Sequence, residues 1–78
     1  MRVTYDPSAD AGYISFREIE SGGAKHTVPL DIEDGPETLV NLVLDFDGEE
    51  RLIGIEVLHA SECLPPELLR HAEPPDRH

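Results

Sequence analysis

Cysteine is nearly absent from this sequence of 78 residues, in which Cys63 is the only one. One cysteine cannot form a disulfide within the chain, and the Cys/His spacing of a zinc site is missing as well. A chain below about 80 residues has a core only marginally large enough to hold a fold, so small domains often rely on such cross-links. Self-association is the remaining source of buried surface. A single free thiol also suits a reducing compartment, so the sequence favours the cytoplasm.

Basic residues are scarce too, because 6 Lys and Arg stand against 17 Asp and Glu, for a net charge of −11. Nucleic acids and anionic membranes are bound by clustered basic side chains, whereas here these are scattered among carboxylates. This balance argues against both classes of partner. The acidity favours solubility, and it would also suit a small basic protein as partner.

Long hydrophobic runs are missing. The longest, 39–44, is interrupted by Asn41 and is far below the roughly 20 residues of a membrane helix. The first residues do not read as a signal peptide. The sequence also has no glycine-rich phosphate loop, nucleotide fingerprint or Ser-His-Asp order, so no cofactor is expected.

Alternation of polar and apolar residues predicts five short strands, at 2–5, 13–17, 26–32, 40–46 and 53–57. Turn-forming residues separate them, at 6–8, 21–23, 34–36 and 47–50. Pro29 lacks an amide donor and favours an edge position for the third strand. The last two strands form the clearest hairpin. Their second face carries Val43, Leu52 and Leu58, so a helix or a second subunit is expected to cover it.

A short helix is predicted around 64–70, where prolines stand at its first turn. The fold class is therefore α+β and mainly β, an antiparallel meander of about five short strands with one short C-terminal helix. Residues 1–71 form one domain, and 72–78 form a tail that frays.

Two groups of residues have the chemistry for acid-base catalysis. Asp6, Asp10 and Tyr13 lie around one tight connection and could bind a hard cation or move a proton, although Asp residues at such places commonly form turns and caps. Glu56 and His59 could pair, but a spacing of three puts them on opposite faces of a strand. A structural role is favoured for both groups.

Asp45 and Asp47 are the candidate metal ligands, since a spacing of two places them on one face of a strand. The surrounding residues do not reproduce a calcium loop, so a solvated hairpin end is favoured. His26 aligns with apolar residues and is expected to be packed. Cys63 is likewise expected to be buried, with no base to activate it.

Two blocks of sequence resemble a known family. Tyr5-Asp6-Pro7-Ser8-Ala9-Asp10-Ala11-Gly12-Tyr13-Ile14 forms the first block, and Arg51-Leu52-Ile53-Gly54-Ile55-Glu56-Val57-Leu58 with Ala60-Ser61 forms the second. They resemble domain of unknown function 2283, the YuzE-like family of small bacterial and archaeal proteins. In that family a glycine often stands just before the Arg-Leu pair, where this chain has Glu50, with Gly48 nearby. The resemblance implies a compact sheet with a terminal helix and no established activity.

The residues of the motif suit packing better than chemistry. Ala9 and Ala11 are small, Tyr13 can pack and donate through its hydroxyl, and Gly54 lets a ring or another backbone approach the sheet. The leading hypothesis is a non-enzymatic, homodimeric interaction module. The alternatives are a small metal-assisted or acid-base enzyme that uses the residues above, and an acidic antitoxin-like partner of a small basic protein.

Overall fold

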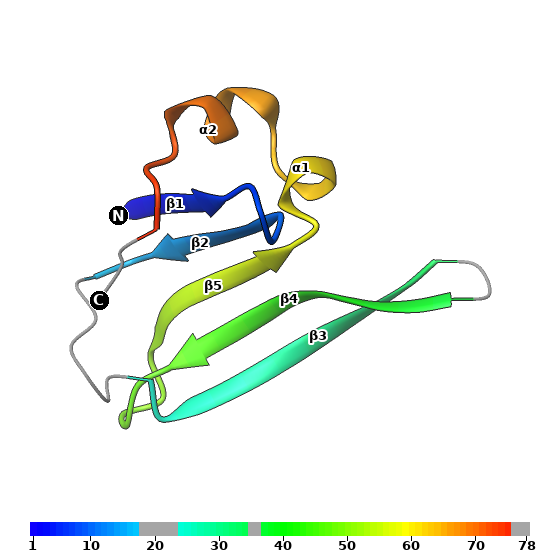
Figure 1. Cartoon of the computed structure of the whole chain (residues 1–78). Helices are drawn as coiled ribbons and strands as arrows, with labels where there is room; N and C mark the ends of the chain where they lie inside the picture. The colour runs from blue at the N-terminus through cyan, green and yellow to red at the C-terminus, as the bar shows by residue number, and fades with distance from the viewer. Residues whose placement is uncertain (18–23, 35–36, 76–78) are drawn as a thin grey trace.

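The computed structural model describes residues 1–17, 24–34 and 37–75 of the chain. The predicted turn at 21–23 lies outside these ranges, as do most of the turn at 34–36 and the last residues of the predicted tail, 76–78. Figure 1 shows one open sheet with the helical segment near one of its ends. The elements, in chain order, are β1 (Arg2–Asp6), β2 (Ala11–Ser15), β3 (His26–Asp34), β4 (Glu37–Phe46), β5 (Leu52–Leu58), α1 (Ala60–Cys63) and α2 (Pro66–His71).

The sheet has the strand order β1-β2-β5-β4-β3, and each neighbouring pair is antiparallel. This confirms the predicted fold class of an antiparallel, mainly β structure. The order also shows where the meander is interrupted, because β2 and β3 are consecutive in the chain but not neighbours. A β1–β2 hairpin and a β3–β4–β5 meander are joined by the pairing of β2 with β5, in which Tyr13 lies opposite Glu56.

The predicted hairpin at the end of the sheet region is confirmed by the β4–β5 pairing, which runs from Leu42 opposite Val57 to Phe46 opposite Leu52. The edge position predicted from Pro29 is confirmed too, since β3 is the last strand of the sheet. The register of β3 against β4 shifts between Leu30 and Asp31. A missing donor and a shifted register both weaken the outer edge of β3 as a template for another strand.

The structure has two short helical segments within its described residues, where the sequence predicts one. α1 ends where Leu64 adopts an extended conformation, immediately before Pro65, and Pro66 then opens α2. The residue before a proline is driven out of the helical region, which explains the break. Glu73 falls within the predicted tail and forms a parallel bridge with Thr4, through Tyr5 N–H to Glu73 O at 2.8 Å and Glu73 N–H to Val3 O at 2.9 Å.

The core is small. Among the residues whose burial the structure describes, 1–17, 24–30 and 41–75, the buried hydrophobic side chains are those of Ile53, Val57 and Ala60. Alternation along β5 places Ile53 and Val57 on one face of the sheet, and the helical segment covers that face at Gly12, where an added Cβ would lie 3.2 Å from a Leu64 methyl carbon and 3.4 Å from Ala60 Cβ. The helical segment thus seals one end of this face.

Gly54 is required by the ring of Tyr13. A Cβ at position 54 would lie 2.0 Å from the Tyr13 hydroxyl and 2.4 Å from its Cζ. The ring therefore lies directly over the backbone of β5, as the sequence predicted for a glycine inside a strand. This contact ties β2 to β5 on the face opposite to Ile53.

Substitution of Gly54 by alanine is predicted to destabilise the fold, because the added methyl group and the Tyr13 ring cannot share the same space. The expected loss is about 1–3 kcal/mol of unfolding free energy, measured by urea denaturation. Gly48→Ala is the matched control, since its Cβ would meet only Lys25 Cγ at 3.6 Å. In a Tyr13→Ala background the cost of Gly54→Ala should shrink, and an unchanged cost there would contradict the assignment.

Candidate functional site

Asp10 joins the β1–β2 connection to the start of α1. Its carboxylate accepts hydrogen bonds from the Tyr5 hydroxyl at 2.8 Å, the Ser61 N–H at 2.9 Å and the Ser61 hydroxyl at 2.7 Å, and its carbonyl accepts from Ala60 N–H at 2.9 Å. Three hydrogen bonds hold the pKa of Asp10 below its usual value. The Ser61 hydroxyl has the largest effect, followed by the Tyr5 hydroxyl and the Ser61 N–H. Bonding to Asp10 raises the pKa of Tyr5. Asp10 thus acts as an acceptor that fixes two segments.

The other two residues of that candidate group have different partners. The Asp6 carboxylate accepts from the N–H and hydroxyl of Ser8, at 3.0 and 2.7 Å, in a local turn. Tyr13 donates its hydroxyl to Asp45 at 2.8 Å, across the sheet. The three residues grouped by sequence therefore take part in three separate arrangements.

Tyr13 and Asp45 belong to a row of polar side chains that crosses the sheet over Gly54. Asp45 also accepts the hydroxyl of Thr27 on β3 at 3.0 Å. Burial has the largest effect on the pKa of Tyr13 and raises it, and the hydrogen bond to Asp45 raises it further. The phenol therefore stays protonated and remains a donor at neutral pH. Glu56 lies opposite Tyr13 in the β2–β5 register. His59 begins α1 in a left-handed conformation with φ 55°, beyond the end of β5.

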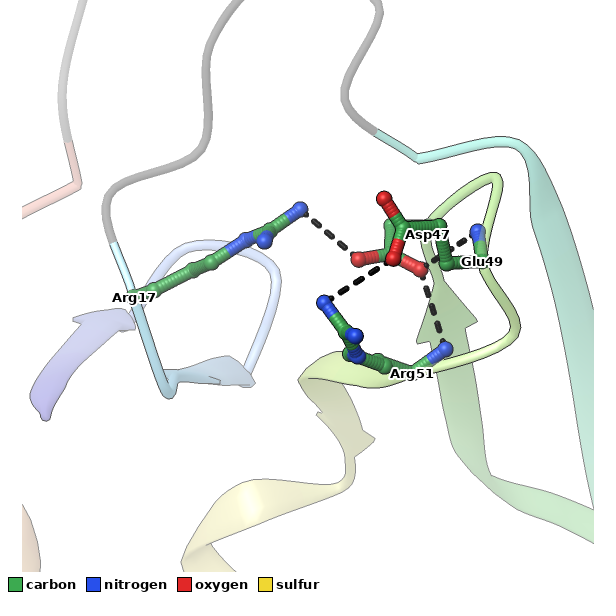
Figure 2. A network of polar contacts seen from close by, with 4 residues as sticks. All are labelled: Arg17, Asp47, Glu49 and Arg51. Atoms are coloured by element: carbon green, nitrogen blue, oxygen red, sulfur yellow. Dashed lines mark hydrogen bonds and ion pairs between the residues drawn. The ribbon is translucent and has the colours of Figure 1, made fainter.

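Asp47 lies at the β4–β5 turn and is the one charged residue buried among those described, with 6% of its surface exposed. Figure 2 shows its contacts: one carboxylate oxygen accepts the backbone N–H groups of Glu49 at 2.8 Å and Arg51 at 2.9 Å, and the other pairs with Arg17 at 3.0 Å. An exposed pair between Arg51 and Glu49 lies beside it. The hydrogen bond from the Arg51 N–H has the largest effect on the pKa of Asp47 and lowers it. The Glu49 N–H and the charges of Arg17 and Arg51 lower it further, while burial acts in the opposite direction.

The β4–β5 turn needs a left-handed residue at Glu50, not at Gly48. Glu50 has φ 64°, while Glu50 N–H donates to Asp47 O at 3.1 Å and Asp47 N–H donates to Arg51 O at 2.9 Å. A turn followed by a left-handed residue usually carries glycine at that place. This chain therefore places a glutamate at a position whose backbone conformation favours glycine.

Most of the polar groups named so far bond to other parts of the fold. The carboxylates of Asp6, Asp10, Asp45 and Asp47 accept hydrogen bonds from structural donors, and both tyrosine hydroxyls are donors. Asp45 and Asp47 have different sets of partners, because the register shifts after Asp45 where β4 ends. Within the part of the chain that the structure describes, no three His, Cys, Asp or Glu side chains gather in a way that could hold a metal ion.

The prediction that His26 and Cys63 are packed in the interior is wrong, because both are exposed. Cys63 lies at the end of α1, where its sulfur accepts from Asn41 Nδ2 at 3.2 Å. The Oδ1 of the same Asn41 side chain is buried without a hydrogen-bond partner. This contact could not be predicted from the sequence, since Asn41 and Cys63 come from distant segments.

The largest feature of the surface is an apolar face of the sheet. By the register of the strands its aliphatic members are Val3, Ile14, Val28, Leu30, Leu42, Leu44, Ile53, Ile55 and Val57, and Tyr5, Gly12 and His26 lie on the same face. Val28 and Leu30 are 43% and 42% exposed, and Ile14, Ile55, Leu42 and Leu44 are half-buried. The sequence predicts that a helix or a second subunit covers the other face, which carries Val43 and Leu58, whereas the helical segment lies on the face that holds the core and covers it only in part.

None of the helices in the described residues is both long enough and apolar enough to span a membrane.

Replacement of Glu50 by glycine is predicted to stabilise the protein, because glycine adopts φ 64° without the steric cost that a side chain imposes. After the entropy that glycine adds to the unfolded chain, a gain of about 0.5 kcal/mol is expected in urea denaturation. Glu50→Ala keeps the strain and serves as the control. Equal stability of the two variants would show that the conformation at position 50 carries no cost.

Acid unfolding is predicted to depend on Asp47. Its pKa is lower in the folded chain, so the unfolded chain binds more protons at acidic pH and stability rises with pH. The contribution is complete above the ordinary value of 3.8 and is lost as the pH falls through the lowered folded pKa. Asp47→Asn should therefore flatten the acid side of a stability-versus-pH curve. Glu49→Gln, in an exposed pair, should leave that slope unchanged; identical curves for both variants would refute the role of Asp47.

Comparison with known proteins gives a family. Residues 2–61 match the family model described as "Protein of unknown function (DUF2283)". No curated protein and no solved structure matches the sequence. The matched range contains β1 to β5 and the first residues of α1, including Asp10, Tyr13, Gly54 and Ser61. The chain belongs to the DUF2283 family.

Proposed function

We propose that this protein is a non-enzymatic interaction module that works as a homodimer. The observation that carries the proposal is the amount of surface that a single copy leaves exposed. A folded monomer of 8.7 kDa is expected to expose about 4,700 Å². This chain exposes 5687 Å². A standard protein interface removes about 800 Å² from each partner, so one such contact would account for most of the excess.

The shape of the chain supports the same conclusion. Its radius of gyration is 13.0 Å, against about 11.5 Å for a compact chain of this length. With three buried hydrophobic side chains among the described residues, one copy has a small core for its size. A second copy would supply the burial that disulfides or metals supply in other small domains.

The non-enzymatic part of the proposal rests on how the candidate residues are used. A general base needs a free acceptor close to a substrate, and a nucleophile needs an adjacent base. Asp10, Asp45 and Asp47 instead accept two or three structural hydrogen bonds or ion pairs each, and Tyr5 and Tyr13 donate to them. An exposed free thiol at Cys63 supports placing the protein in the cytoplasm.

The subunit number is tested by native mass spectrometry without chelator, together with light scattering over a range of concentrations. A species of twice 8.7 kDa is expected, and its melting temperature should rise with protein concentration, because dimerisation stabilises the folded state by mass action. A monomer at every concentration would rule out the homodimer. A metal ion or small molecule retained in stoichiometric amount would instead favour the enzymatic alternative.

A further inference from the structure

We infer that the second copy packs on the apolar face, sheet against sheet across a two-fold axis. This inference rests on the proposed homodimer and says which of its surfaces forms the contact. Four surfaces are available to a second copy: the outer edge of β3, the outer edge of β1, the polar face over Gly54 and the apolar face. The first three each carry a feature that opposes pairing.

The two edges of the sheet are poor templates for a partner. On β3, Pro29 has no N–H to donate, and the register against β4 shifts between Leu30 and Asp31, where β4 has Asn41 as an extra residue and the ladder is locally irregular. On β1, the bridge to Glu73 already uses the Tyr5 N–H and the Val3 carbonyl, and the Arg2 guanidinium pairs with the Glu73 carboxylate at 2.6 Å. Edge-to-edge addition of a second sheet is therefore disfavoured at both ends.

The polar face opposes contact with an identical copy because of its charge. It carries the half-buried Val43 and Leu58, but also Asp45 and Glu56 beside Tyr13 and Thr27, and each whole chain has a net charge of −11. Two such faces would bring carboxylates against carboxylates, which costs free energy when water is removed.

The apolar face has the opposite character. Nine of its members are Val, Leu or Ile, with Tyr5 and His26 as its polar members, and the helical segment covers it only at the end near Gly12 and Val57. At the other side Val28 and Leu30 leave more than two fifths of their surface exposed. A surface free of charge is where two highly acidic chains can approach most closely. Two sheets packed by such faces lie about 10 Å apart with their strands roughly aligned, as in a β-sandwich.

The surface estimate agrees with a second copy as the occupant. The excess of about 1,000 Å² in one chain is close to what one partner of a standard interface buries, so a single contact on one face is sufficient. A two-fold arrangement presents the same residues from both copies, so one substitution removes two side chains from the interface.

The test compares two leucines on opposite faces. Leu30 is 42% exposed on the apolar face, and Leu58 is half-buried at the end of β5, where it alternates with Glu56 and Gly54 on the polar face. Leu30→Ser is expected to raise the Kd for dimerisation at least about tenfold in analytical ultracentrifugation, while Leu58→Ser leaves it unchanged. Val28→Thr, which keeps the shape and strand preference of valine, should weaken the dimer in the same direction if Leu30→Ser does not fold.

The outcomes separate this inference from the homodimer itself. A dimer that survives Leu30→Ser and Val28→Thr but is lost in Leu58→Ser would overturn the apolar face and leave the homodimer standing. A monomeric wild-type protein would remove both. Ionic strength gives a second readout, because salt screens the repulsion between two acidic chains and the dimer should be equally tight or tighter at high salt. A dimer that weakens with salt would point to charge pairing and would also overturn the apolar face.

Discussion

The pairing of β2 with β5 is the interaction on which the rest of the structure depends. It joins a hairpin at one end of the chain to a three-stranded meander at the other, between residues that are 39 positions apart at Ser15 and Gly54 and 47 apart at Ala11 and Leu58. In this register Tyr13 reaches over Gly54 to Asp45, and Gly12 lies beneath Ala60 and Leu64. Because successive side chains point to opposite faces, a slip of one residue would move Tyr13 to the apolar face and Ile14 away from it.

Local structure was predictable from the sequence because local constraints determine it. Alternation located the strands, Pro29 indicated an edge, and Gly54 indicated a close approach over the sheet. The strand order was not predictable, since β5 could pair with β2 only through a long-range choice that no single segment records. The same limit hid the partners of Asp10 and Asp47, each of which binds residues from another part of the chain. The split of the helix at Leu64 follows from a local rule, because the residue before a proline is driven out of the helical region. It could therefore have been predicted from Pro65.

The residues that carry the likeness to the DUF2283 family acquire a physical reading from these contacts. Asp10 in the first block accepts hydrogen bonds from Tyr5 in the same block and from Ser61 in the second. Tyr13 in the first block lies over Gly54 in the second. A family model that covers 2–61 therefore describes the junction between the two halves of the sheet. An aspartate at such a junction looks catalytic in the sequence, since carboxylates serve both purposes. At this junction the Asp10 carboxylate accepts hydrogen bonds from Tyr5 and Ser61, and the Asp45 carboxylate accepts from Tyr13 and Thr27.

The acidity of the chain and its apolar face follow from one constraint. A sheet of this size has two faces that contact either solvent or protein. Its short helical segment covers only one end of one face. Water can solvate the face that carries Asp45, Glu56 and the hydroxyl of Thr27, but it cannot solvate nine aliphatic side chains at low cost. A strong negative charge opposes the approach of two copies wherever it is exposed, so the homodimer that we propose would use the surface that lacks it. In that arrangement the acidity of the chain, by opposing the other contacts, would direct the second copy to the apolar face.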